Sequence, residues 1–223
     1  MKYGKRHPLF WVLTVLVPIN LYVIFCYAPV ERTMGIVQKV FYFHVASAWI
    51  GLLAFCVVFG ASILYLWKRD DLTNHLALAS AEIGTVFITG TLLTGPLWAY
   101  PIWNTWWTWD PRLTTTVVLW FMYVAYMALQ SGGATEARKR LAAVYGIIAF
   151  VNVPLVFFSA RWWRSIHPIV VTNEGIGLDG KMRVALFLTL VVFSLLYMYL
   201  VPLRIKSIAL REQVRQLKAD LLR

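Results

Sequence analysis

The sequence predicts an all-α integral membrane protein with six transmembrane helices. Of its 223 residues, 60% are hydrophobic and 14% are charged, and the mean hydropathy is +0.67. A water-soluble domain with a polar surface does not have this composition. Six apolar runs of about 18 residues or more recur along the chain, each long enough to cross about 30 Å of hydrocarbon. The loops between them are too short for a second folded domain.

The predicted spans cover residues 9–30, 41–67, 76–98, 113–130, 141–160 and 184–203. The first is longer than the apolar core of a signal peptide and is followed by no small-residue cleavage site, which predicts that it is retained. Pro18 and Asn20 in its middle predict a kink. The second span is the longest, and the third is rich in glycine and alanine, which is typical of a helix packed closely inside a bundle.

The third span also carries Glu82, about six residues from its inner end. A carboxylate at that depth needs a partner or a proton. An interhelical hydrogen bond is the simpler interpretation, and a functional role is the alternative.

Residues 1–203 thus form a membrane domain, and residues 204–223 form a basic tail. In the tail, Leu210, Val214, Leu217 and Leu221 repeat at intervals of four, three and four. This spacing predicts an amphipathic cytoplasmic helix. Its basic face suits an anionic lipid surface, and a short coiled contact with a partner subunit is the alternative.

The formal net charge of +11 is explained by topology. With the N-terminus inside, 14 of the 21 lysines and arginines fall on the inner side and 7 on the outer side. The positive-inside rule then favours both termini in the cytoplasm. No nucleic-acid-binding motif competes with this interpretation. Cys26 and Cys56 form no C-x-x-C motif, so thiol-redox chemistry is not predicted.

A tryptophan-rich segment, residues 98–114, connects the third and fourth spans on the predicted extracytoplasmic side. It holds five of the chain's eleven tryptophans, namely Trp98, Trp103, Trp106, Trp107 and Trp109. If the segment is helical, Trp103, Trp106 and Trp107 share one face and form a flat aromatic shelf. Tryptophan is also enriched at membrane interfaces, so a belt of interface anchors stays open beside a site for a planar apolar ligand.

Two polar residues end this segment. Asp110 directly precedes Pro111 and is predicted to cap the N-terminus of the fourth span, with proline at the first helical position. Arg112 either anchors a carboxylate of a ligand or simply extends its charge to the interface.

The predicted topology sorts the four histidines into two pairs. His7 and His75 fall on the cytoplasmic side, whereas His44, near the outer end of the second span, and His167, after the fifth, flank the tryptophan-rich segment. Each alone is more often a hydrogen-bonded interface residue. As a pair they match a six-coordinate haem iron, which takes one imidazole on each side of the porphyrin. Cations and aromatics that suit haem propionates and ring edges lie near His167: Arg161, Trp162, Trp163 and Arg164.

Residues 103–114, Trp-Asn-Thr-Trp-Trp-Thr-Trp-Asp-Pro-Arg-Leu-Thr, resemble the WWD signature of membrane haem-handling proteins in cytochrome c biogenesis. Asn104 stands where glycine is usual, while the aromatic and charged positions of the signature are kept. The length, the six spans and the flanking histidines make the whole chain similar to the smallest branch of that family, the haem exporter protein C branch.

The resemblance implies that haem b lies on the outward tryptophan-rich segment, with His44 and His167 as axial ligands and with Arg112, Arg161 or Arg164 at the propionates. It implies a multi-pass protein of the bacterial inner membrane that is not itself an enzyme and that delivers haem to a periplasmic haem chaperone. The implied partners are the ATPase and permease subunits of an ABC transporter and a small single-span membrane subunit. This chain has no G-x-x-x-x-G-K-[ST] phosphate loop of its own.

Two other functions stay open. A haem lyase that acts directly on apocytochrome c predicts additional histidines and a longer chain. A small-solute permease predicts polar residues through the centre of the bundle, where this sequence has few, chiefly Asn20, Glu82 and Asn152.

Overall fold

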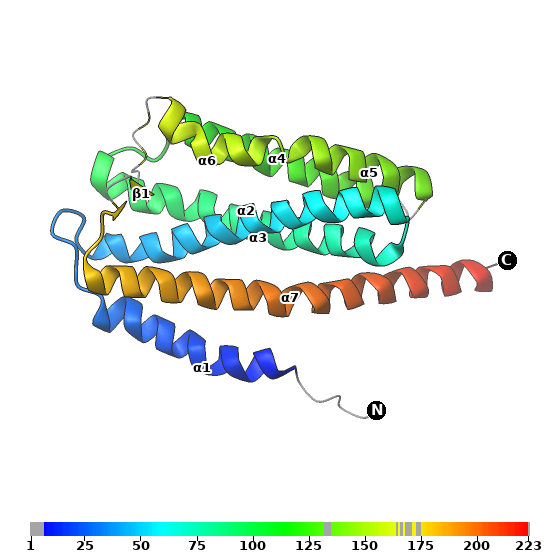
Figure 1. The fold of residues 1–223 in the computed structure, drawn as a ribbon, viewed down its shortest axis with the longest axis horizontal. Coiled ribbons are helices and arrows are strands. Elements are labelled where there is room, and N and C mark those ends of the chain that lie inside the picture. The colour runs from blue at the N-terminus through cyan, green and yellow to red at the C-terminus, as the bar shows by residue number, and fades with distance from the viewer. Residues whose placement is uncertain are drawn as a thin grey trace.

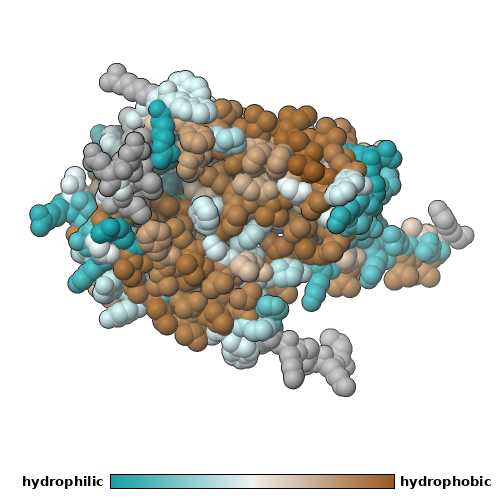
Figure 2. Space-filling view, in the orientation of Figure 1, coloured by the Kyte–Doolittle hydropathy of each residue, from teal (hydrophilic) through white to brown (hydrophobic). Residues whose placement is uncertain are grey.

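The structure, a computed structural model, describes residues 7–131, 135–163, 165, 167, 171–172 and 175–222. Within them the chain forms a bundle of long helices that lie side by side (Figure 1). Six helical segments are long and apolar enough to span a bilayer. Figure 2 shows a hydrophobic band across the middle of the visible face, with polar residues at both ends. The predicted all-α membrane fold is confirmed.

The helices are α1 (Pro8–Tyr22), α2 (Lys39–Lys68), α3 (Asp71–Trp103), α4 (Pro111–Ser131), α5 (Glu136–Ala149), α6 (Asn152–Trp162) and α7 (Gly180–Leu221). A π-helical turn, Val23–Tyr27, continues α1, and a 3₁₀ turn, Ile36–Gln38, precedes α2. Two short strands, β1 (Val171–Thr172) and β2 (Gly175–Ile176), pair antiparallel before α7. The end of the bundle where α2 begins and α3 ends is called the outer end, after the predicted topology.

The helices α2 and α3 form the central pair of the bundle. Arg69, in a left-handed conformation with φ 59°, ends α2, and the Asp70 side chain accepts a hydrogen bond from the Thr73 backbone N–H at 2.9 Å to begin α3. Small residues let the two backbones approach closely, because a Cβ at Gly84 would lie 2.7 Å from Cε1 of Phe55. On one side α7 covers this pair and α1 packs against α7, and on the other side α4, α5 and α6 cover it (Figure 1).

The predicted fifth span consists of two helices rather than one. Its first part, α5, ends at Ala149, and α6 begins at Asn152. Pro154 has no N–H to donate to the carbonyl of Phe150, so the helical hydrogen bonds are interrupted there. Asn152 uses the break to donate from Nδ2 to the carbonyl of Thr115 on α4, at 2.9 Å. The break therefore supplies a contact between two walls of the bundle.

Polar side chains tie α1 to the rest of the bundle. The Thr189 hydroxyl of α7 donates to Oδ1 of Asn20 at 2.9 Å. At the outer end Lys39, only 4% exposed, donates from Nζ to the carbonyls of Ile24 and Phe25 at 2.8 Å and of Ala28 at 3.3 Å. The π-helical turn and the chain end after it leave these carbonyls without helical partners, and Lys39 satisfies them.

We expect Lys39→Met to loosen the attachment of α1. Methionine keeps the apolar volume but removes the donor to three carbonyls, at a cost of about 1–3 kcal/mol. Thermal unfolding of the purified protein in detergent measures the loss. Lys39→Arg, which retains donors, is the control, and a Lys39→Met protein that unfolds at the wild-type temperature would contradict this role.

Glu82 is paired with Arg204 of α7. The guanidinium donates from Nε and Nη2 to the two carboxylate oxygens, and Nη2 lies 2.7 Å from Oε1. Arg204 directly follows the last apolar run, so the pair lies where α7 leaves the predicted hydrocarbon layer. The interhelical hydrogen bond that the sequence favours for Glu82 is confirmed.

Candidate functional site

A cavity of about 360 Å³ opens at the outer end among α2, α3, α4 and α6. Its volume falls in the range of small-molecule and cofactor sites, about 300–1,000 Å³. Its lining is mostly apolar and aromatic. On α2 the lining extends from Phe41 to Leu52, which spans roughly 16 Å along the helix axis. The cavity therefore reaches from the tryptophan-rich segment well into the bundle.

Two imidazoles line this cavity. His44 lies on α2 and His167 in the loop after α6, and their ring centroids are 6.3 Å apart, with the ring planes inclined at 33°. Two imidazoles that bind one iron from opposite sides, each at about 2 Å, hold their centroids roughly 6 Å apart. The fold thus brings the two outer histidines to a separation that suits a shared metal ion.

Thr94 of α3 orients the first imidazole. Its hydroxyl donates to the carbonyl of Gly90 at 2.7 Å, so it accepts from Nδ1 of His44 at 3.1 Å. His44 therefore carries its proton on Nδ1 and presents the lone pair of Nε2, which is the form that binds a metal. Gly95 leaves room for the ring, because a Cβ there would lie 3.4 Å from Cε1 of His44.

Arg112 lies beside the second imidazole. Its Nη1 is 3.4 Å from Nδ1 of His167, and its Nη2 donates to the carbonyl of Phe157 at 2.8 Å. A guanidinium can only donate, so Nδ1 of His167 is the acceptor in this arrangement. Nε of Arg112 is buried and has no hydrogen-bond partner within the part of the chain that the structure describes. The guanidinium therefore keeps a donor for an anion in the cavity.

The tryptophan-rich segment is not one continuous helix, so the condition for a flat shelf of Trp103, Trp106 and Trp107 is not met. Trp103 is the last residue of α3, and Asn104 follows it in a left-handed conformation with φ 50°. The chain then remains non-helical until Pro111 begins α4. Asparagine adopts this conformation more readily than most residues, as glycine does, so the Asn104 departure from the signature suits the turn.

The tryptophans form walls rather than a flat shelf. The rings of Trp98 and Trp103 meet at 82°, and those of Trp107 and Trp109 at 84°. Trp98, Trp103, Trp106 and Trp107 line the cavity, whereas Trp109 is 77% exposed and lies outside the lining. A flat ligand would therefore meet aromatic surfaces on more than one side.

Asp110 caps α4 as predicted. Its Oδ1 accepts from the backbone N–H of Arg112, and its carbonyl accepts from the N–H of Thr114, both at 2.9 Å. Asp110 is 8% exposed and is not among the residues that line the cavity. It acts on the site by fixing the first turn of α4, from which Arg112 extends.

Arg161, in the last turn of α6, also lines the cavity. Its guanidinium carbon lies 5.3 Å from the ring centroid of Phe157. Arg161 and Arg112 thus give the lining two cations, both from segments near the outer end. Arg164, predicted beside them, falls outside the described residues, and Trp162 and Trp163 are 60% and 51% exposed.

Comparison with known proteins assigns the chain to a family. The family model described as Heme exporter protein C matches residues 3–220. The chain belongs to the Heme exporter protein C family. It is 34% identical to Heme exporter protein C of Bradyrhizobium diazoefficiens, over 86% of this chain and 74% of that protein, and 34% identical to that of Escherichia coli, over 86% and 78%. A ccmC-like mitochondrial protein of Marchantia polymorpha, named for cytochrome c biosynthesis, is 30% identical over 83% and 78%.

Sequence reasoning missed three residues at the site of this Heme exporter protein C family member. Thr94 and Gly95 adjoin His44, and the Phe157 carbonyl holds Arg112. Thr94 lies 50 residues from His44, and a threonine within an apolar run is usually bonded to its own helix. No pattern along the chain distinguishes it from the other threonines of α3.

Proposed function

We propose that this chain binds haem b in the outer cavity, with His44 and His167 as axial ligands, and delivers it for the assembly of c-type cytochromes. The observation that carries the proposal is the 6.3 Å separation of the two imidazole centroids within an aromatic cavity. The names of the relatives, Heme exporter protein C and a cytochrome c biosynthesis protein, support it. Haem is the cargo of this site, and the chain holds and orients it.

The polar groups around the cavity suit the two propionates of haem. Arg112 and Arg161 supply cations, and buried donors without partners among the described residues lie on Arg112 (Nε), Trp98 (Nε1) and Thr108 (Oγ1). Loading changes the contacts of Arg112. When Nε2 of His167 binds iron, its proton moves to Nδ1, so Arg112 leaves Nδ1 and donates to a propionate instead.

The handover requires an open side of the site. Trp106 and Trp109 are 55% and 77% exposed at the outer end, beside the cavity. We infer that they face the periplasmic haem chaperone that receives the haem. The ATPase and permease subunits of an ABC transporter and the small single-span subunit belong to the same proposal, as does a place in the bacterial inner membrane with anionic lipid at the inner face.

Purification tests haem binding directly. Protein expressed with ample haem and purified in detergent is expected to show the visible spectrum of low-spin, bis-histidine haem, with close to one haem per chain by the pyridine haemochrome assay. Colourless protein that also fails to bind added haemin would overturn the proposal. A bound haem with a high-spin spectrum would instead contradict the ligand pair.

Thr94→Val is expected to weaken haem binding roughly 10–100-fold, which is the usual effect of removing the hydrogen-bond partner of a metal-ligating histidine. Valine keeps the shape of threonine but cannot accept from Nδ1 of His44. Haemin titration followed by absorbance measures the affinity. Thr85→Val is the matched control, because the Thr85 hydroxyl donates to Ala81 on the same helix and lies outside the cavity lining. Equal affinities for the two variants would exclude the role of Thr94.

A further inference from the structure

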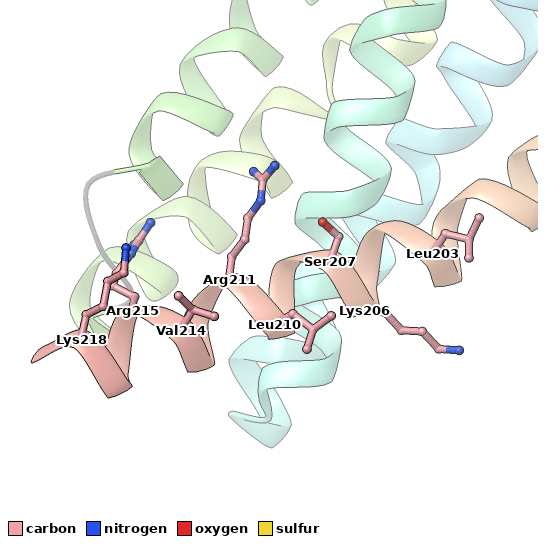
Figure 3. Close-up of a pocket in the computed structure, with 8 residues that line it drawn as sticks. All are labelled: Leu203, Lys206, Ser207, Leu210, Arg211, Val214, Arg215 and Lys218. Carbon is pink, nitrogen blue, oxygen red and sulfur yellow. The ribbon is translucent and has the colours of Figure 1, made fainter. Parts of the chain in front are cut away.

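At the end of the bundle opposite the cavity, the last part of α7 carries an apolar stripe. Leu203, Leu210 and Leu217 recur every seven residues, and so do Ser207, Val214 and Leu221. In a heptad these are the d and a positions of a coiled-coil seam. The leucines and valine of the seam are 44–86% exposed. Its first part lines a groove together with Lys206, Arg211, Arg215 and Lys218 (Figure 3).

The bundle holds this helix by its other face. Arg204 and Glu212, eight residues apart on α7, pair with Glu82 and His75, seven apart on α3, and Nε2 of His75 lies 2.8 Å from Oε2 of Glu212. Ile208 between them is 5% exposed. The contact face of α7 is therefore fixed, and the seam lies on the side turned away from the bundle.

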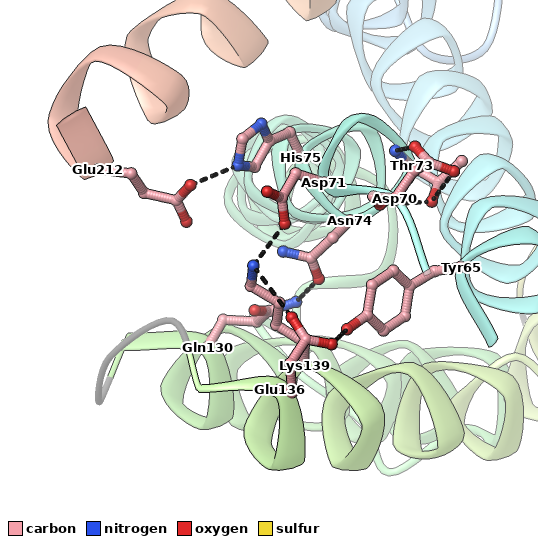
Figure 4. Close-up of polar contacts among 10 residues, drawn as sticks. All are labelled: Tyr65, Asp70, Asp71, Thr73, Asn74, His75, Gln130, Glu136, Lys139 and Glu212. Carbon is pink, nitrogen blue, oxygen red and sulfur yellow. Dashed lines mark hydrogen bonds and ion pairs between the residues drawn. The ribbon is translucent and has the colours of Figure 1, made fainter. Parts of the chain in front are cut away.

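The polar contacts around His75 extend across several helices (Figure 4). On the same turn of α3, Asp71 pairs with Lys139 of α5 at 2.5 Å. Tyr65 of α2 donates to Glu136 of α5 at 3.0 Å. These contacts connect the ends of α2, α3 and α5 beside the place where Glu212 of α7 pairs with His75. After Glu212, the end of α7 extends beyond the neighbouring helices (Figure 1).

The geometry of α7 leaves little of the seam within reach of the bilayer. The helix runs from Gly180 to Leu221 without a break, 42 residues or about 63 Å, while hydrocarbon takes about 30 Å. With Arg204 at the inner edge of the hydrocarbon layer, Leu217 and Leu221 lie roughly 20 and 26 Å beyond that edge along the helix axis. A helix that lies on the membrane surface would need a break near Arg204. Pro202 stands at that place, but α7 continues through it as one helix to Leu221. The apolar stripe therefore needs a protein partner.

A second copy of this chain fits poorly. Two copies in one membrane would pair in parallel, which places Lys206 at a g position against Arg211 at the facing e position. Like charges at these positions oppose pairing. Four basic residues lie beside the seam: Lys206, Arg211, Arg215 and Lys218. Among the described residues, Asp220 is the one acidic residue at its edge. A partner that complements this basic surface must carry acidic residues.

We propose that residues 203–221 of α7 are a docking helix for a cytoplasmic partner that presents an acidic amphipathic helix. Leucine and valine at the seam bury the apolar face of the partner, and the flanking cations pair with its carboxylates. This inference is independent of what the outer cavity binds. It makes α7 the connection between the membrane bundle and a cytoplasmic protein.

The test uses the full chain in phosphatidylcholine nanodiscs and a fluorescent four-heptad peptide with isoleucine at a, leucine at d and glutamate at e and g. Fluorescence anisotropy is expected to show binding that weakens with added salt. Arg211→Glu/Arg215→Glu/Lys218→Glu should abolish binding and should instead bind the matching peptide with lysine at e and g. Leu210→Ala/Leu217→Ala should weaken binding about tenfold or more. Arg138→Glu/Arg140→Glu, on exposed residues of α5, should leave it unchanged.

Three results would overturn the proposal. The first is no binding of the acidic peptide to the wild-type chain, or binding that the Arg138→Glu/Arg140→Glu control removes equally. The second is loss of peptide binding when the nanodiscs contain phosphatidylglycerol, which would mean that the tail prefers an anionic bilayer. The third is a concentration-dependent dimer that Leu210→Ala/Leu217→Ala dissociates, which would make a second copy the occupant.

Discussion

Replacing either outer histidine with alanine is expected to convert bound haem from six-coordinate and low-spin to five-coordinate and high-spin. His44 and His167 line one cavity with ring centroids 6.3 Å apart, and under the proposed function each supplies one axial bond, for which the described lining offers no other imidazole. Haem affinity should fall at least about tenfold in each variant, since half of the axial ligation is lost. Absorbance spectra and haemin titrations of the purified variants measure both effects.

The controls separate loss of a ligand from loss of fold. His75→Ala removes an imidazole that is bonded to Glu212 at the opposite end of the bundle, and should leave the haem spectrum unchanged. His7→Ala, before α1, should do the same. In His44→Gly the vacated space should admit free imidazole, which would restore the low-spin spectrum of a correctly folded protein. Unchanged spectra in both outer variants would exclude the ligand pair.

The second large effect is expected from Gly84→Val, at a close approach of α2 and α3. A Cβ at position 84 would lie 2.7 Å from Cε1 of Phe55 and 2.8 Å from Cβ of Ala54. Phe55 cannot yield easily, because its ring is stacked on Tyr123 with centroids 3.5 Å apart. Valine must therefore push the helices apart, at a cost of about 1–3 kcal/mol or more. Thermal unfolding in detergent should show a clear loss of stability.

Gly60→Val is the matched control, because it adds the same side chain to α2 where no atom lies within 4 Å of the new Cβ. The Gly84→Val protein should also bind haem more weakly, since α2 carries His44 and α3 carries Thr94, and separating them breaks the 3.1 Å contact that orients the imidazole. Equal stability of the two variants would show that the α2–α3 contact tolerates expansion.

Features that depend on neighbouring residues were predictable from the sequence. The six spans follow from runs of apolar residues, and the Asp110 cap follows from an aspartate directly before Pro111. The two outer histidines were predicted to lie at one end of the bundle because each was assigned to the same side of the membrane. The sequence predicted that Glu82 needs a partner or a proton, but it did not identify the partner, Arg204.

Other features were decided by how the helices pack. The flat shelf does not form because Asn104 turns the chain after Trp103, and the fifth span, although present, is interrupted because the helical hydrogen bonds break before Pro154. Local propensity allowed a helix in both places. Contacts with other parts of the chain, such as that of Asn152 with Thr115, accompany the irregular backbone.

The sequence by itself determined that this is a helical membrane protein, where its spans lie, and which aromatic segment and histidines are candidates for a site. Only the tertiary structure decided that the imidazoles of His44 and His167 lie 6.3 Å apart in one cavity, that Thr94 lies within hydrogen-bond distance of His44, and that the tail continues α7 away from the bundle. The reason is physical. Hydropathy is a sum over neighbouring residues, whereas a site is made by side chains that are distant in sequence and meet only when whole helices pack.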